Sequence, residues 1–149
     1  MKEIKSRGIR SPSVTQGNKF KYFPNNSNKE FRFYKDCQNL AAEVFKASAD
    51  APKEYRFTIC KKVHDICCDL IFSVRLANSF ELGSTDRKEE QICIMELLQR
   101  LDDLLPVIRR CRCITLGQEG EITKRIGNLK FSFEKWLDSD AERIADMGK

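Results

Sequence analysis

One stretch constrains the fold of this chain more than any other: residues 51–80, which read APKEYRFTICKKVHDICCDLIFSVRLANSF. Pro52 suits the first turn of a helix, where the dipole also favours the negative charge of Glu54. Apolar residues then recur every three or four positions on two adjacent helical lines: Ile59, Val63, Ile66, Leu70 and Ala77, and Cys60, Cys67, Ile71 and Val74. This stripe is wider than one partner helix covers. We predict one helix of about seven turns at the centre of a bundle, with apolar surface left for another copy or partner.

A first helix is predicted before this stretch, starting at Ser27 or Asn28. Ser27 and Glu30 have the spacing of a capping box, in which two side chains bind backbone amides at the start of a helix. The apolar period fades over residues 47–50. The predicted buried face consists of Phe33, Cys37, Leu40, Ala41 and Val44.

A third helix is predicted to open at Thr85 or Asp86, after a turn that contains Gly83. Its broad apolar stripe consists of Ile94, Leu97, Leu98, Leu101, Leu104, Leu105 and Ile108. Pro106 lies inside this pattern, where it removes a backbone hydrogen bond and clashes with the preceding turn. We therefore expect a kink over residues 102–105 or an early end to the helix.

The fourth helix has the most regular repeat in the chain, in steps of four and three: Ile122, Ile126, Leu129, Phe133 and Trp136. Thr115 and Gln118 have capping-box spacing and mark its start. After Leu137 the chain is polar, and we expect it to fray. Short connections place successive helices side by side, so the predicted fold is all-α, an antiparallel up-down-up-down four-helix bundle. The predicted organisation is a basic extended arm (1–28), the bundle (29–138) and a polar C-terminal tail (139–149).

Positive charge is concentrated at the N-terminus. Residues 1–35 hold nine Lys or Arg against two acidic residues, a net charge of +7, so the rest of the +5 chain carries −2. A basic tail favours a polyanion, most commonly nucleic acid. Lys19 and Lys21 alternate with aromatic residues, a combination that suits phosphate neutralisation and stacking on unpaired bases. The alternatives are a leader that aids solubility, or an arm that packs its aromatic residues on the bundle.

Further basic residues form three clusters that an up-down bundle brings to one end, because the second and fourth helices start where the third stops. We predict nucleic-acid contacts there, in addition to Lys19 and Lys21. An equally weighted alternative is solvated charge interleaved with acidic residues. The clusters are Arg56, Lys61 and Lys62; Arg109, Arg110 and Arg112; and Lys124 and Arg125.

No catalytic site is predicted. His64 is the one histidine, which excludes a multi-histidine metal site, and a structural role for it is favoured over a catalytic one. Helical ribonucleases need an arginine close to their histidine, but Arg56 lies two turns before His64. No phosphate-binding glycine loop is present, because residues 117–120 lack a following Lys-Ser/Thr pair. We therefore expect a protein that is not an enzyme and needs no cofactor.

The seven cysteines form no CxxC pair, and most fall on or beside the apolar stripes, where cysteine packs as a small apolar residue. No metal site is expected. Their odd number and the lack of an apolar signal behind residues 1–5 favour free thiols in a reducing compartment, so a cytoplasmic location is expected. Apolar runs are too short to span a bilayer.

From Tyr34 to Leu137 the chain resembles the four-helix-bundle proteins that include the accessory variability determinant of diversity-generating retroelements and the proteins encoded within 23S ribosomal RNA intervening sequences. The resemblance rests on the segment PKEYRFT (52–58) at the entry to the second helix and on Ala77-Asn78 near its end. It also includes the leucine-rich third helix and the ending FEKWL (133–137). Pro106, the many cysteines and the N-terminal arm depart from the pattern.

The resemblance implies a homopentameric barrel of bundles that binds RNA or an RNA/DNA hybrid and associates with a reverse transcriptase. Such a protein is a non-catalytic accessory factor that supports cDNA synthesis from a template RNA. The wide stripes on the second and third helices agree with an oligomer, although periodicity does not specify five copies. Two alternatives stay open: a scaffolding oligomer that recruits a protein partner without nucleic acid, and, less favoured, a helical ribonuclease or toxin component that uses His64.

Overall fold

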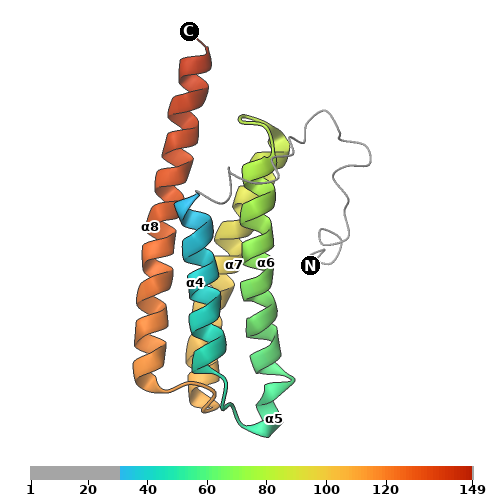
Figure 1. Ribbon diagram of the computed structural model, residues 1–149, viewed down its shortest axis with the longest axis vertical. Helices are drawn as coiled ribbons and strands as arrows, with labels where there is room; N and C mark the ends of the chain where they lie inside the picture. The colour runs from blue at the N-terminus through green and yellow to red at the C-terminus, as the bar shows by residue number, and fades with distance from the viewer. Residues whose placement is uncertain (1–30, 149) are drawn as a thin grey trace.

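The computed structural model describes residues 31–148. Within that range all the secondary-structure elements are helices. The four long helices are α4 (Arg32–Ala47), α6 (Ile59–Ser79), α7 (Thr85–Arg110) and α8 (Leu116–Met147). Figure 1 shows the chain crossing the molecule in α4, returning in α6, crossing again in α7 and returning in α8. Each long helix packs against two others, so the predicted all-helical bundle is confirmed. None of the described helices is long and apolar enough to cross a bilayer.

The core lies between the four long helices and consists of the residues that periodicity singled out. The predicted faces of the first and fourth helices are buried in full, from Phe33 to Val44 and from Ile122 to Trp136. In α7 the whole predicted stripe is buried except Leu104, which is half-buried. The start of α4 is joined to α8 by aromatic contacts: the Trp136 ring lies 5.0 Å from that of Phe31 and 5.7 Å from that of Phe33, between centroids.

The wide stripe on α6 is covered mainly by the chain itself. Val63, Leu70 and Val74 are fully buried, while Ile59 and Ile71 at the edges are half-buried. The width has a simple reason: α6 packs against both α4 and α7, so its apolar arc must serve two neighbours. The stripe is therefore no evidence for a further copy.

The predicted seven-turn second helix is wrong in one respect, because it is broken near its start. A single turn, α5 (Lys53–Arg56), follows Pro52, and α6 begins after Thr58, whose ψ of −100° is not helical. Residues 57–59 are Phe, Thr and Ile, side chains that lose rotamer freedom in a helix. The Thr58 hydroxyl also donates to the Glu54 carbonyl (3.4 Å), a local bond that competes with helix continuation.

One expected helix end is corrected, and another lies outside the described residues. α7 continues through Pro106 to Arg110, so of the two expected outcomes, a kink or an early end, the early end is wrong. The proline removes one hydrogen bond, whereas continuing the helix buries both Leu105 and Ile108 completely. At the other terminus of the bundle, the expected start of α4 at Ser27 or Asn28 lies outside the described residues, as does its capping box; in the described part α4 begins at Arg32 after Phe31.

The polar segment expected to fray after Leu137 is instead helical to Met147. Asp140 explains the difference, because its side chain is buried against Arg87 of α7. Arg87 donates from Nε and Nη2 to the two carboxylate oxygens (2.7 and 2.9 Å), and Gln91 adds a third bond (2.9 Å). Arg87 Nη1 also donates to the carbonyls of Ala77 and Phe80 at 3.2 Å each. One buried arginine thus joins the ends of α6 and α8 to the start of α7.

Candidate nucleic-acid interface

The three predicted basic clusters lie at one end of the molecule, called here the basic end. In Figure 1 this end holds α5, the start of α6, the α7–α8 connection and the start of α8. One contact joins the last turn of α7 to the first turn of α8: Arg109 Nε donates to Glu119 (2.7 Å). The other two predicted contacts, Lys19 and Lys21, lie outside the described residues. The described residues of the set are Arg56, Lys61, Lys62, Arg109, Arg110, Arg112, Lys124 and Arg125.

Backbone geometry at the end of α7 places Arg112 outward. The amide of Cys113 bonds the carbonyl of Ile108 (2.8 Å) and the amide of Arg112 bonds that of Arg109 (2.9 Å). This is the paired pattern of a Schellman motif, which requires a left-handed residue after the helix cap. Arg112 adopts it, with φ of 64°, at a position that usually holds glycine. An exposed cation therefore occupies a conformation that costs about 1 kcal/mol for a residue other than glycine.

The adjoining start of α8 is held by the predicted capping box, which is confirmed. Thr115 Oγ1 accepts from the Gln118 amide (3.1 Å), and Gln118 Oε1 accepts from the Thr115 amide (2.8 Å). These bonds satisfy two amides that the helix itself leaves unpaired. They also orient the first turn, so that Glu119 meets Arg109. The α7–α8 connection is consequently an ordered turn rather than a loose loop.

Half of the described cations at the basic end are held by partners within the chain. Arg109 pairs closely with Glu119, and Lys61 pairs with Asp65 at 2.9 Å. Arg56 donates to the Ala51 carbonyl (3.0 Å), and Arg125 lies 4.0 Å from Glu43. Arg109, Lys61 and Arg56 are therefore less available as free ligands for a polyanion, whereas Arg125 is held only loosely by Glu43.

The other half is uncommitted. Lys62, Arg110, Arg112 and Lys124 are exposed, and none of them makes an ion pair with any residue in the range 31–148. They come from α6, α7, the α7–α8 connection and α8, so segments distant in the sequence supply them. Uncommitted cations keep all their hydrogen-bond donors for an external anion.

His64 lies inside the contact between α4 and α6. Its Nε2 is 2.8 Å from Ser48 Oγ and 3.6 Å from Cys60 Sγ, and its ring meets the Phe45 ring edge-on at 4.8 Å. The Ser48 hydroxyl donates its one proton to the Val44 carbonyl (2.8 Å), so the assigned neutral tautomer carries the proton on Nε2. Burial lowers the pKa of His64, with an opposing smaller effect from Asp65. These contacts fit the structural role that the sequence favoured.

The cysteines are mostly packed in the interior, and all seven are free thiols. Cys37, Cys60, Cys67 and Cys113 are buried. Burial raises the pKa of Cys67 to about 12 and that of Cys113 to about 11, so both thiols stay protonated at neutral pH. Within residues 31–148, no cluster of three His, Cys, Asp or Glu side chains has the arrangement of a metal site.

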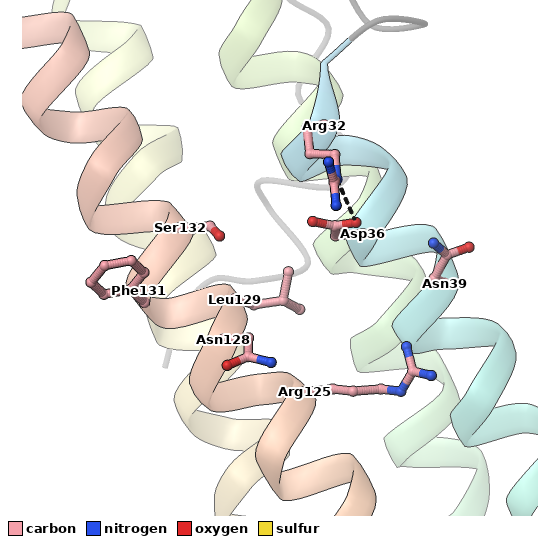
Figure 2. A pocket seen from close by; sticks show the side chains of 8 residues that line it. All are labelled: Arg32, Asp36, Asn39, Arg125, Asn128, Leu129, Phe131 and Ser132. Carbon is pink, nitrogen blue, oxygen red and sulfur yellow. Dashed lines mark hydrogen bonds and ion pairs between the residues drawn. The ribbon is translucent and has the colours of Figure 1, made fainter.

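A second polar feature, which the sequence analysis did not single out, is a groove between α4 and α8 (Figure 2) with a volume of about 430 Å³. No short motif marks it, because its two walls lie some ninety residues apart in the chain and meet only in the folded bundle. Its lining consists of Arg32, Asp36 and Asn39 from α4 and Arg125, Asn128, Leu129, Phe131 and Ser132 from α8.

Fold and site together define a helical-bundle protein with a cationic end and a polar lateral groove. In comparisons with known proteins, no family model and no curated sequence matches the chain. The resemblance to retroelement accessory proteins and intervening-sequence proteins therefore stays a prediction from the sequence.

Proposed function

We propose that this protein is a non-catalytic nucleic-acid-binding accessory protein, and that its ligand is the RNA or RNA/DNA hybrid handled by a retroelement reverse transcriptase. The observation that carries the proposal is the set of four uncommitted cations at the basic end. The choice of reverse transcriptase as protein partner rests on the family resemblance alone.

Charge distribution supports a local interface instead of a uniformly basic surface. Residues 36–149 carry a net charge of −2, so long-range attraction from this part of the chain is weak. Binding in this region must come from clustered donors, and the basic N-terminal segment adds general attraction for phosphate. When either set of cations binds RNA phosphates, counterions are released from the RNA. The affinity for RNA should therefore fall steeply as salt is added.

The test replaces Arg110, Arg112 and Lys124 together with glutamine and measures binding to single-stranded RNA across a salt series. Each lost phosphate contact reduces the log–log salt slope by about 0.7, so three contacts reduce it by about 2. Arg109 is kept, because its bond to Glu119 supports the turn.

The matched control replaces Arg75, Lys88 and Lys135 with glutamine, which removes the same charge from exposed positions away from the basic end. This variant should lose less affinity and keep most of its salt slope. Equal losses in the two triple variants would show that net charge, not the basic end, governs binding. Absence of RNA binding by the intact chain at low salt would refute the proposal.

A second candidate function, a scaffolding oligomer, is favoured by one observation. Phe72 of α6 and Ile92 of α7 are 57% and 68% exposed, and each lies eight residues from the connection between these adjoining helices. Exposed large apolar side chains at matching heights suit a protein contact. Native mass spectrometry counts the copies, for which the resemblance implies five. Replacing both residues with glutamate should dissociate an oligomer formed through this face, and an unchanged copy number would exclude the face.

A further inference from the structure

Two arginines reach the α4–α8 groove from opposite walls. Figure 2 shows the Arg125 side chain extending from α8 towards α4, with Asp36 of α4 facing the gap above it. Arg32 stands at the start of α4, and buried Leu129 contributes an apolar patch. Phe131 lies on the side of α8 that faces away from α4, so it borders the groove without filling it. The groove is therefore an open polar cleft with cationic donors on both walls.

Both arginines are held only loosely by carboxylates. The contact from Arg32 to Asp36 is 3.4 Å and that from Arg125 to Glu43 is 4.0 Å. Charge-assisted hydrogen bonds are about 2.7–2.9 Å long, a range that Arg87 and Arg109 reach with their own partners. Arg32 and Arg125 therefore keep N–H groups available for a ligand, whereas Arg87 and Arg109 donate theirs to carboxylates of the chain.

Arg125 also has one donor atom without a partner in the described chain. Its Nε is buried from solvent, yet it has no hydrogen-bond partner among residues 31–148. Buried donors in proteins are nearly always paired, so an unpaired one points to an acceptor that completes the site. The Arg125 side chain as a whole is 41% exposed, so an oxyanion can reach its terminal nitrogens, and a turn of the side chain brings Nε into the two-point geometry that guanidinium groups favour.

The other side chains of the groove indicate which kind of oxyanion it would bind. Asn39 and Asn128 each offer an amide donor and an amide acceptor, and Ser132 adds a hydroxyl. These groups suit a ligand with hydroxyl and ring-nitrogen atoms next to its anion, which describes a nucleotide. The volume of about 430 Å³ is within the range of small-ligand sites.

We propose that the α4–α8 groove binds a nucleotide. Arg125 and Arg32 bind its phosphate group, and Asn39 and Asn128 form hydrogen bonds with its nucleoside part. The inference rests on and deepens the proposed function, because Arg125 also belongs to the basic end and would lead a single strand from that end into the groove. Asp36 and Glu43 oppose an anion, but both carboxylates are partly exposed and screened by solvent.

The experiment titrates the isotope-labelled full chain with inorganic phosphate, with AMP and with a single-stranded RNA hexamer. Nuclear magnetic resonance follows the Nε–H signal of Arg125 and the side-chain amide of Asn128. AMP and the hexamer should shift both signals at lower concentration than inorganic phosphate does. Arg125→Gln and Arg32→Gln should each weaken AMP binding about tenfold.

Arg100→Gln is the matched control, since Arg100 of α7 also has a loose partner, Glu96 at 4.0 Å, but lies outside the groove. Its AMP affinity should equal that of the unmodified chain. A weaker AMP affinity in this control would overturn the assignment, as would equal binding of phosphate and AMP, which indicates a plain anion site.

The outcomes also separate this inference from the proposed function. If the hexamer binds and shifts only signals of Arg110, Arg112 and Lys124, the groove inference fails and the proposed function stands. If AMP occupies the groove but no RNA binds, the proposed function fails and the groove stands as a mononucleotide site. If none of the three ligands shifts a groove signal, the inference is overturned.

Discussion

At the scale of single residues, the structure separates side chains that hold the fold from side chains left for other uses. Arg87 and Arg109 are bound at 2.7 Å to Asp140 and Glu119, whereas Arg110 and Arg112 have no ion pair with any described residue. The same residue type thus has opposite roles, and the distance to the nearest carboxylate decides between them.

Arg112 gives the sharpest test of stability at this scale. Arg112→Gly should raise the free energy of unfolding by about 1 kcal/mol, because glycine adopts a positive φ without a steric cost. The melting temperature should rise by about 2–4 °C. Arg110→Gly, which removes the same charge from the last turn of α7, should instead lower stability. Urea denaturation of the two variants measures the difference, and destabilisation by Arg112→Gly would contradict the turn geometry.

His64 predicts how stability depends on pH. Burial lowers its pKa in the folded chain below the ordinary value of about 6.5, so above that pH both states hold a neutral ring and contribute no difference. As the pH falls below 6.5, the unfolded chain takes up the proton more readily, and stability should decrease until the folded ring is also protonated. His64→Gln keeps a donor for Ser48 and should flatten the change between pH 7.5 and 5.5, as measured by urea denaturation. An identical pH profile for the variant and the unmodified chain would refute the effect.

At the scale of elements, helix ends account for most of the differences from expectation. α8 extends ten residues beyond Leu137 because Asp140 is needed by the buried Arg87. α7 passes through Pro106 because its last turn buries Ile108. In both helices a tertiary contact outweighs the local preference. In α8 it is a buried ion pair, which costs about 3–5 kcal/mol to break by removing one partner. In α7 it is the burial of an apolar side chain.

Truncation tests this explanation of α8. A chain ending at Leu137 lacks Asp140 and should lose about 3–5 kcal/mol of stability, because Arg87 is left buried without its carboxylate. A chain ending at Met147 keeps the pair and the whole of α8, so its stability should change little. Thermal melts followed by circular dichroism compare the two. Equal stability would mean that the ion pair contributes nothing to the fold.

At the scale of the whole molecule, charge is divided between the N-terminal segment and the bundle. Residues 1–28 hold six basic residues and one acidic residue, a net charge of +5 that equals the net charge of the whole chain. General attraction for a polyanion therefore comes from that segment, and the bundle contributes a local set of cations at the basic end.

Deleting residues 1–28 should separate the two contributions. The remaining chain has no net charge, so RNA affinity at low salt should fall and the salt slope should become shallower, with residual binding from the basic end. Adding the triple glutamine change to the deletion should then weaken binding further, to what Lys62 and the groove arginines contribute. Filter binding at several salt concentrations measures both steps. Unchanged affinity after the deletion would exclude Lys19 and Lys21 as contacts.

Local sequence determined most of the helices and their buried faces. The 3.6-residue period identified the buried faces of α4 (Phe33 to Val44) and α8 (Ile122 to Trp136). Residues at this period lie on one side of a helix, which is the side that packs against the core. Thr115 and Gln118 marked a helix start for an equally local reason, since a capping box closes within one turn.

Only the tertiary structure decided the features that join distant segments. The pairing of Arg87 with Asp140, the division of cations into committed and free, and the groove between Arg32 and Arg125 all depend on contacts across the bundle. No period or motif encodes them, because a side chain's partner is set by how helices pack rather than by its neighbours in the chain. The hydrophobic pattern thus specified which face of each helix turns inward, and packing determined which polar groups pair within the chain and which stay unpaired.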